Sequence, residues 1–250
     1  MAAPQPILRP DVEPSHLRSS GAIIDAFNDG AAQIVFLLLS NLDEGLAERI
    51  LPADELERAR RLVAPPVRRG FVGGRYLLRS VLATLAGVAP ASLELQTGSH
   101  GKPSLVGYER LRASFNLSHS GDLAALALVC ARRVGIDIEA ERPLTDAALL
   151  ARRIFSPRER ERFESLPENA RGAALLEAWT RKEAVLKAIG TGVSGGLDSV
   201  EVLADAVETP ETWSVQTLAM PTGFFGAIAL ENGPVPVVTW QAVPQGDSSA

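Results

Sequence analysis

Two acidic side chains stand two positions apart in a short apolar segment, Val134-Gly-Ile-Asp-Ile-Glu139. The segment predicts a β-strand, in which side chains at i and i+2 point to the same face. Asp137 and Glu139 therefore share one face, and the apolar residues between them fill the core on the other. Two neighbouring carboxylates repel each other unless a cation lies between them, and hard divalent cations prefer oxygen ligands. The pair is a candidate metal site, with a solvent-facing acidic strand edge as the alternative.

A second candidate site lies in a segment of strong helix formers without Gly or Pro, residues 176–187. Trp179, Glu183 and Lys187 stand at i, i+4 and i+8 and share one helix face. An exposed Glu–Lys pair at this spacing is common and contributes only about 0.3–0.5 kcal/mol. Trp179 indicates, however, that this face is at least partly buried, and a buried pair needs partners that offset its desolvation. A metal ion for Glu183 and a phosphate for Lys187 would be such partners.

Polar residues are also grouped in Ser114-Phe-Asn-Leu-Ser-His-Ser120, directly before a predicted strand. Ser118, His119 and Ser120 are interpreted as a short loop that presents hydroxyl and imidazole groups to an anion. A turn with local side-chain capping is the alternative. A hydrolytic Ser–His pair is disfavoured, because adjacent residues rarely face each other as nucleophile and base and no G-x-S-x-G elbow surrounds them.

Basic residues are concentrated in the N-terminal half, where a solvated arginine-rich face explains most of them. Arg75 and Arg79 stand at i and i+4 of a predicted helix, where like charges are unfavourable unless an anion or an acid lies nearby. Gly101-Lys102-Pro103 predicts a constrained turn that directs the Lys102 side chain. The arginines of this set are Arg58, Arg60, Arg61, Arg68, Arg69, Arg75 and Arg79.

Composition excludes several classes of protein. The net charge of -5 argues against a general nucleic-acid binder, since such proteins carry an excess of Lys and Arg. The single cysteine, Cys130, suits a reducing compartment, and its apolar neighbours predict a buried thiol. We find no signal-peptide pattern and no apolar run of the ~18–20 residues that a membrane span needs. The sequence therefore predicts a cytoplasmic protein.

One pattern of strand, helices and strands occurs twice along the chain. Two similar strands, 125–128 and 227–230, are offset by 102 positions, as are Gly121 and Gly223. Chance similarity of small apolar strands is the alternative to a duplicated unit. Duplication predicts an α/β (α+β) fold of two similar lobes related by a pseudo-twofold axis, each a small, mostly antiparallel sheet packed with helices. The active site is then expected in the cleft between the lobes.

The predicted boundaries are an N-terminal extension at 1–30, an N-terminal lobe at 31–131, a C-terminal lobe at 132–243 and a tail at 244–250. The N-terminal lobe contains predicted strands at 33–39, 92–95 and 123–129, and helices at 55–63 and 71–86. The C-terminal lobe contains predicted strands at 134–139, 199–202, 224–230 and 235–241, and helices at 149–154, 157–165 and 171–188.

Taken in order, the segments GKPSL, FNLSHS, VGIDIE and EAWTRKEAVLKAIGTG resemble the surfactin-synthetase-type 4′-phosphopantetheinyl transferases. The resemblance runs from about Glu55 to Gly196, and its motifs are specific in combination although none is so alone. It implies transfer of the 4′-phosphopantetheine group from coenzyme A to a serine of an apo acyl or peptidyl carrier protein, with release of adenosine 3′,5′-bisphosphate. It also implies a monomer whose lobes form a pseudo-dimer, serving polyketide, nonribosomal peptide or fatty acid biosynthesis.

The resemblance implies a role for each matching residue. Asp137, Glu139 and Glu183 match ligands of Mg²⁺, with Mn²⁺ possible. Glu183, Lys187 and Asp137 form the catalytic set, in which Lys187 acts at the transferred phosphate and Glu183 is a candidate to take the serine proton. The residues expected to bind coenzyme A are Arg68, Arg75, Lys102, Ser118, His119, Asp137, Lys182 and Lys187.

Three points of the resemblance stay open. The N-terminal basic residues vary in the family, so Arg58, Arg68 and Arg69 all remain candidates. The carrier-binding surface is expected by position in the helical segment after Glu139, including 155–159. A non-catalytic coenzyme A or nucleotide binder, an adaptor for carrier proteins and a short trimeric holo-acyl-carrier-protein synthase are the alternatives. Glu183 with Lys187 argues against the first, the combined set of basic and acidic residues against the second, and the two lobes against the third.

Overall fold

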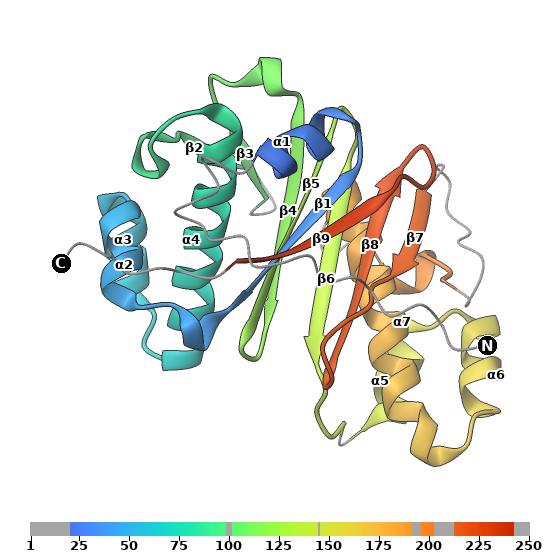
Figure 1. The fold of residues 1–250 in the computed structure, drawn as a ribbon. Helices are drawn as coiled ribbons and strands as arrows, with labels where there is room; N and C mark the ends of the chain where they lie inside the picture. Colours follow the sequence, from blue (N-terminus) through green and yellow to red (C-terminus); the bar gives the residue numbers. More distant parts are fainter. Residues whose placement is uncertain (1–20, 99–101, 145, 192–195, 203–212, 243–250) are drawn as a thin grey trace.

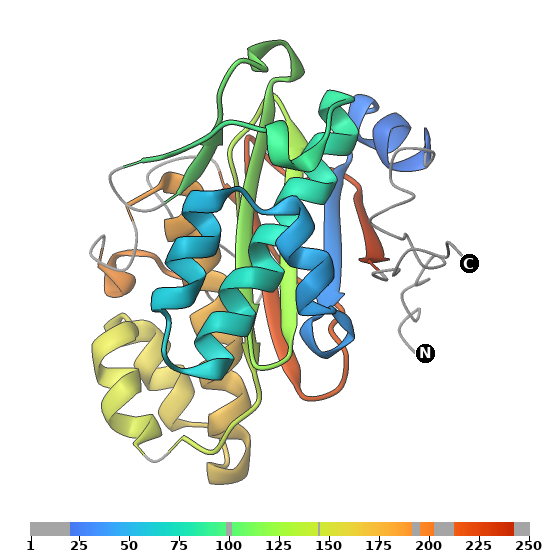
Figure 2. The same cartoon turned by 90° about the vertical axis from the view of Figure 1, so that its left-hand side faces the viewer.

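The computed structural model describes residues 21–98, 102–144, 146–191, 196–202 and 213–242 (Figure 1). Two groups of helices lie on the outside, and two sheets lie between them. Seen from the side, helices α2 to α4 cover one face of the N-terminal sheet (Figure 2). The architecture is thus helices, sheet, sheet, helices, which agrees with the predicted fold of two mixed lobes.

The N-terminal lobe is built on a four-stranded sheet of order β4-β5-β1-β9. Strand β1 pairs antiparallel with β5 and parallel with β9. The strands are β1 (Ala32–Leu38), β4 (Ala113–Ser120), β5 (Leu123–Cys130) and β9 (Val237–Ala242), with a separate hairpin of β2 (Leu95–Thr97) and β3 (Pro103–Leu105). The helices are α1 (Gly21–Asn28), α2 (Glu44–Ile50), α3 (Ala53–Arg61) and α4 (Pro65–Ala86), and the short 3-10 helices are η1 (Leu39–Asn41), η2 (Pro90–Ser92) and η3 (Glu109–Leu111).

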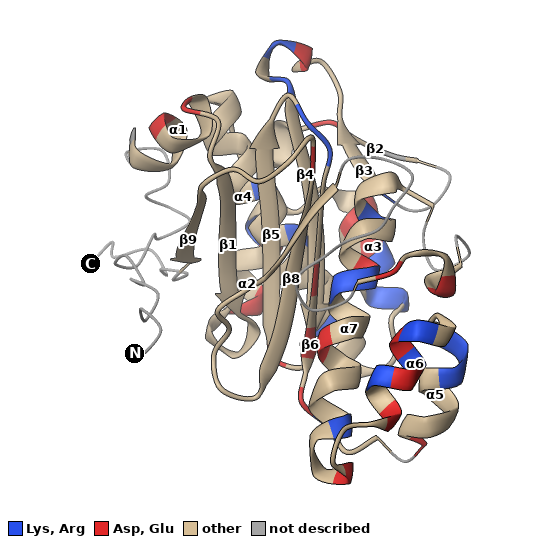
Figure 3. Cartoon of the chain, turned by 90° about the vertical axis from the view of Figure 1, so that its right-hand side faces the viewer, with Lys and Arg blue, Asp and Glu red and all other residues tan. Residues whose placement is uncertain are grey.

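The C-terminal lobe has a three-stranded antiparallel sheet of order β6-β8-β7. Its strands are β6 (Val134–Ala140), β7 (Trp213–Thr217) and β8 (Phe224–Glu231). Its helices are α5 (Ala147–Ile154), α6 (Pro157–Glu164), α7 (Glu168–Ile189) and the 3-10 helix η5 (Leu197–Ser199). Charged residues gather on the helices, most densely on α6, while the strands are largely uncharged (Figure 3).

The two lobes repeat one order of elements. Strand β1, helix α4 and strands β4 and β5 recur as β6, α7, β7 and β8, and α4 and α7 each have 22 residues. In each sheet the last strand of this unit lies between the other two. Gly121 and Gly223 precede the equivalent strands, and both adopt a positive φ, 56° and 85°, that favours glycine. The internal repeat that the sequence predicts is therefore present in the fold.

Apolar residues form a third buried cluster between the two sheets. Ile34, Leu123 and Val129 of the N-terminal sheet meet Ile136 and Ile228 of the C-terminal sheet. The other two clusters lie between each sheet and its own helices. The two lobes therefore share a buried core.

Several predicted elements differ from the structure. The predicted strand 199–202 does not form: Ser199 ends the 3-10 helix η5, and only Glu201 makes an isolated bridge. The 118–120 segment is no loop but the end of β4. Strand β9, which the sequence analysis assigned to the C-terminal lobe, pairs with β1 of the other lobe. Helix α4 begins six residues before the prediction, because two prolines occupy its first turn, where no N–H donor is needed.

Two smaller predictions can also be compared with the structure. Cys130, predicted as a buried thiol, is only partly buried at the end of β5. Within the described residues, no helix has both the length and the apolar character that spanning a membrane demands.

Candidate active site

The acidic strand and the Glu–Lys helix lie directly against each other. Strand β6 turns its apolar side chains into the cluster between the sheets, so Asp137 faces the opposite way, toward α7. A Cβ on Gly135 would lie 2.0 Å from the Ala184 carbonyl oxygen and 2.5 Å from the Ala188 nitrogen. Only glycine therefore permits this approach, which places Glu183 and Lys187 over the acidic face of β6.

Lys187, Asp137 and Ser118 form a small polar network at the junction of the lobes. The Lys187 ammonium donates to Asp137 Oδ1 at 2.6 Å and to Ser118 Oγ at 3.0 Å. The Ser118 hydroxyl donates to the same Asp137 oxygen at 3.0 Å. The network combines β4 of the N-terminal lobe with β6 and α7 of the C-terminal lobe, as a site between lobes requires.

Two buried carboxylate oxygens, one on β6 and one on α7, have no hydrogen-bond partner among the described residues. They are Asp137 Oδ2 and Glu183 Oε1, from different elements. Buried polar atoms nearly always have partners, and unsatisfied ones point to a missing ligand or ion. Both are anionic acceptors, so their chemistry fits a hard cation.

Burial dominates the electrostatics of both acids. It raises the pKa of Asp137, and the charge and hydrogen bonds of Lys187, with the Ser118 hydroxyl, partly oppose this rise. Burial also raises the pKa of Glu183, and the neighbouring charge of Asp137 raises that pKa further. Holding both groups ionised is therefore unfavourable without additional positive charge.

Glu139 does not join these two acids. Its Oε2 accepts from Ser120 Oγ at 2.9 Å and from Arg142 Nη1 at 2.7 Å. In the part of the chain that the structure describes, no three His, Cys, Asp or Glu side chains are grouped to hold one metal ion. The predicted set of three metal ligands is thus not assembled in this conformation, and the third acid is paired with Arg142.

Lys102 lies close to the site but contacts backbone. Its ammonium donates to the Val134 carbonyl at 3.2 Å and to the Lys187 carbonyl at 2.9 Å, so it joins the start of β6 to the last turn of α7. Burial lowers the pKa of Lys102. Gly101 of the predicted turn lies outside the described residues.

The expected nucleotide-binding residues of the N-terminal lobe are only partly together. His119 is exposed on the α4 side of β4, where a Cβ on Gly70 would lie 3.1 Å from its Nε2. The guanidinium groups of Arg58 and Arg75 lie 5.0 and 5.6 Å from the centre of the Phe71 ring. Phe71 follows Gly70 directly, so these three cationic or titratable groups lie along the first half of α4.

Two other arginines have acidic partners instead. Arg68 pairs with Glu44 at 3.2 Å on the side of helix α2. Arg79 is buried and donates two hydrogen bonds to Glu55, at 2.8 and 3.1 Å. The repulsion expected between Arg75 and Arg79 is relieved by this glutamate, because Arg75 also lies 3.6 Å from Glu55 Oε1.

Lys182 is a correction to the predicted ligand-binding set. Its side chain is 0% exposed, and its ammonium pairs with Glu159 Oε2 at 2.6 Å. The same nitrogen donates to the carbonyls of Leu197 at 2.9 Å and Val200 at 2.5 Å. An ammonium has three donors, and all three are used within the C-terminal lobe. Lys182 is therefore inaccessible to a ligand here and fastens α6 and η5 to α7.

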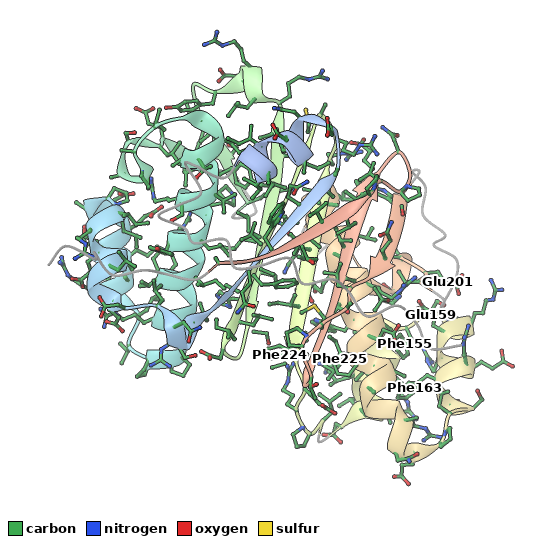
Figure 4. All side chains as sticks on the ribbon, viewed as in Figure 1. Phe155, Glu159, Phe163, Glu201, Phe224 and Phe225 are labelled. Carbon is green, nitrogen blue, oxygen red and sulfur yellow. The ribbon has the colours of Figure 1, made fainter. Side chains whose placement is uncertain are left out.

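The segment expected to bind a carrier is partly core. Phe155 and Glu159 are buried and lie with Phe163 between α6 and α7 (Figure 4), while Arg158 is exposed. A cavity of 180 Å³ adjoins them, separate from the acidic network of β6. Trp179 is partly buried against the same core, which agrees with its interpretation as a packing residue.

Comparison with known proteins matches each lobe separately. Residues 43–131 match the family "4′-phosphopantetheinyl transferase, N-terminal", and residues 133–218 match the "4′-phosphopantetheinyl transferase superfamily". Over 188 residues the chain is 39% identical to the 4′-phosphopantetheinyl transferase HetI of Nostoc sp., covering 72% of this chain and 78% of that protein. This chain belongs to the 4′-phosphopantetheinyl transferase superfamily.

Other members of the superfamily match over similar lengths. The 4′-phosphopantetheinyl transferase AcpT of Salmonella typhi is 33% identical over 196 residues, which cover 77% of this chain and 93% of that protein. The 4′-phosphopantetheinyl transferase of Bacillus subtilis is 30% identical over 164 residues, which cover 66% of this chain and 71% of that protein. The boundary between the two family matches falls between β5 and β6, where one lobe ends and the next begins.

Sequence analysis of this transferase missed the partners of its functional residues. Asn116 and Ser120 bond to β6, and Arg142 pairs with Glu139. A signal for the first two was present, since Asn116, Ser118 and Ser120 alternate with Phe115 and Leu117 at the period of a strand. No local pattern pointed to Arg142.

Proposed function

We propose that this transferase moves the 4′-phosphopantetheine group from coenzyme A to a serine of an apo carrier protein, and that it is of the two-lobed surfactin-synthetase type. The convergence of Asp137, Glu183 and Lys187, with two unpartnered carboxylate oxygens, is the observation that carries the proposal. Separate family matches to two lobes support the two-lobed type over a short, one-lobed synthase.

A divalent cation fits the acidic residues. Asp137 through Oδ2 and Glu183 through Oε1 would hold Mg²⁺ or Mn²⁺, and Glu139 would join them once Arg142 releases it. When bound, the ion would neutralise charge on the pyrophosphate of coenzyme A. Mg²⁺ usually retains several waters, so two or three protein ligands suffice.

Two residues of the chain are proposed to handle the proton of the carrier serine and the negative charge that develops on the phosphate. The serine oxygen forms a bond to the β-phosphorus of coenzyme A, and the bond from that phosphorus to the bridging oxygen breaks. Adenosine 3′,5′-bisphosphate leaves with the bridging oxygen and the electron pair of the broken bond. Glu183 is proposed to take the serine proton, because a carboxylate held at the reacting group can act as a general base. Lys187 is proposed to donate to a phosphate oxygen as charge develops.

For the nucleotide, we propose His119, Arg75 and Arg58. Arg58 and Arg75 flank one aromatic ring, and His119 lies against the preceding turn of the same helix. Arg68, another of the candidates, already has Glu44 and Glu48 as partners. Arg58 is therefore preferred to Arg68. Lys102 and Ser118 are proposed to position neighbouring groups of the site rather than to contact the phosphate.

We also propose that the enzyme works as a cytoplasmic monomer. The apolar cluster between its two sheets supports the monomer, because it joins the two lobes within one chain, as an interface would join two subunits of a dimer. Light scattering at micromolar concentration should give the mass of one chain, and a stable dimer would contradict the proposal.

The decisive experiment incubates the protein with coenzyme A, Mg²⁺ and a panel of apo carrier proteins, and reads the mass of the intact carrier. A gain of one phosphopantetheine group is expected on at least one carrier. Asp137→Ala and Lys187→Ala should abolish this gain while the protein stays folded by circular dichroism. Binding of coenzyme A without a mass gain on any carrier would instead support the non-catalytic binder.

A further inference from the structure

Strand β6 lies at the edge of the C-terminal sheet, with a strand on one side only. It pairs with β8, and within the described residues no second strand of this sheet lies beside it. The N–H groups of Ile136, Ile138 and Ala140 point away from β8 and toward β4 of the other lobe. A buried edge N–H group without a partner is costly, so these groups need acceptors outside their own sheet.

Side chains of β4 accept the hydrogen bonds that a neighbouring strand would otherwise accept from β6. The N–H of Ile136 donates to Asn116 Oδ1 at 2.9 Å, and the N–H of Ala140 donates to Ser120 Oγ at 3.0 Å. Between them, the N–H of Ile138 donates to Ser118 Oγ at 3.3 Å. All three pairs are separated by 20 residues, so β4 and β6 run side by side in register. We call these three residues of β4 the side-chain ladder.

Both serines of the ladder also donate to an acid of the site. Ser118 Oγ donates to Asp137 Oδ1 at 3.0 Å, and Ser120 Oγ donates to Glu139 Oε2 at 2.9 Å. A hydroxyl has a single hydrogen, and accepting the strand N–H leaves that hydrogen for the carboxylate. Each serine thus fixes one carboxylate oxygen, and the other oxygen of Asp137 has no partner in the part of the chain that the structure describes.

We infer that Ser118 and Ser120 are positioning residues that dock the N-terminal lobe on β6 and set the orientation of Asp137 and Glu139. The inference rests on the proposed function, and it gives the serines of the SHS segment a role different from phosphate binding. Ser120 is the clearer case, because among the described residues its hydroxyl bonds only to β6, whereas the Ser118 hydroxyl also accepts from Lys187. Groups that orient metal ligands typically change metal affinity about 10–100-fold when removed.

The test compares Ser120→Ala with Ser120→Thr. Ser120→Ala removes the hydroxyl and should raise the metal concentration for half-maximal transfer about tenfold or more, with little change in kcat at saturating metal or in KM for coenzyme A. Ser120→Thr keeps the hydroxyl and should restore most of the metal affinity. Binding of Mn²⁺ to the protein alone, followed by electron paramagnetic resonance, should show the same order.

Ser114→Ala is the matched control. Ser114 lies on the same face of the same strand, and the described residues contain no bond from it to a carboxylate of β6. This variant should bind Mn²⁺ as the unchanged protein does. Circular dichroism and thermal unfolding identify any variant that fails to fold, and Ser120→Thr then still decides whether the hydroxyl restores metal binding.

Two outcomes would overturn the inference. One is a Ser120→Ala variant with unchanged Mn²⁺ binding, and the other is a Ser120→Thr variant as weak as the alanine. A rise confined to KM for coenzyme A would assign the serine to the nucleotide instead. If the unchanged protein transfers nothing to any carrier, the proposed function fails, but Mn²⁺ binding still tests the serines independently.

Discussion

Asp137 is a buried carboxylate whose two oxygens have different surroundings. It is buried, one oxygen is bound by Lys187 and Ser118, and the other has no partner among the described residues. Burial raises its pKa, whereas Lys187 lowers it. Burial therefore disfavours the negative charge of Asp137, and the Lys187 ammonium favours it.

Asp137→Asn should reduce transfer about a hundredfold or more, because the amide keeps the shape but loses the charge. Carrier mass gain per unit time measures the effect, and circular dichroism shows that the fold remains. Glu141→Gln provides a control, since Glu141 is an exposed acid two residues beyond β6's last acid. Equal rates for Asp137→Asn and Glu141→Gln would remove Asp137 from the mechanism.

Lys182 illustrates the opposite case, a charged residue of the motif that serves the fold. Lys182→Met leaves Glu159 buried without its cation and should cost about 3–5 kcal/mol of unfolding free energy. Urea unfolding measures this cost. The double variant Lys182→Met/Glu159→Gln should recover part of it, because no unpaired charge then remains. A stable Lys182→Met protein that binds coenzyme A weakly would support the ligand role that the sequence suggested.

At the scale of elements, the contact between β6 and α7 determines the site. Gly135→Ala would drive a methyl group into the backbone of α7, which cannot move aside without displacing Glu183 and Lys187. We expect a loss of about 1–3 kcal/mol or more in stability and a larger loss of transfer than stability alone explains. Unfolding curves and carrier mass gain, measured on the same preparations, separate the two effects.

Gly172→Ala is the matched control for this prediction. Gly172 lies in α7 as well, and an added Cβ there would meet no atom within 4 Å. Alanine favours a helix interior over glycine, so this variant should gain about 0.5–1 kcal/mol and keep its activity. If Gly135→Ala behaved like Gly172→Ala, the close packing of β6 on α7 would be wrong.

At the scale of the whole molecule, the two lobes share the cluster between their sheets. They should therefore unfold together in one transition. Ile136→Ala, in that cluster, should cost about 2–5 kcal/mol and shift the transition without splitting it. Trp240 reports on the N-terminal sheet and Trp213 on the C-terminal lobe, so single-tryptophan variants can follow each separately. Two separate midpoints would contradict a shared core.

The position of β9 strengthens this expectation. The last strand follows the C-terminal lobe in sequence but lies parallel to β1 in the other sheet, and the Trp240 indole donates to Gln33 Oε1 at 2.7 Å. Among the described residues, the first and last strands thus lie in one sheet, and the C-terminal lobe stands between them in the sequence. The sequence predicted the strand correctly but not its sheet, since a strand's own pattern carries no information on its neighbour.

Local periodicity alone determined which side chains share a face: Asp137 with Glu139 on a strand, and Glu183 with Lys187 on a helix. It also determined the repeated order of elements in the two lobes. Tertiary structure alone decided which groups lie opposite each face. Serines of β4 bond to the acids of β6, Arg142 pairs with Glu139, and Glu159 pairs with Lys182. The physical reason is that backbone geometry directs a side chain relative to its own element, whereas its partner depends on packing between segments far apart in the chain.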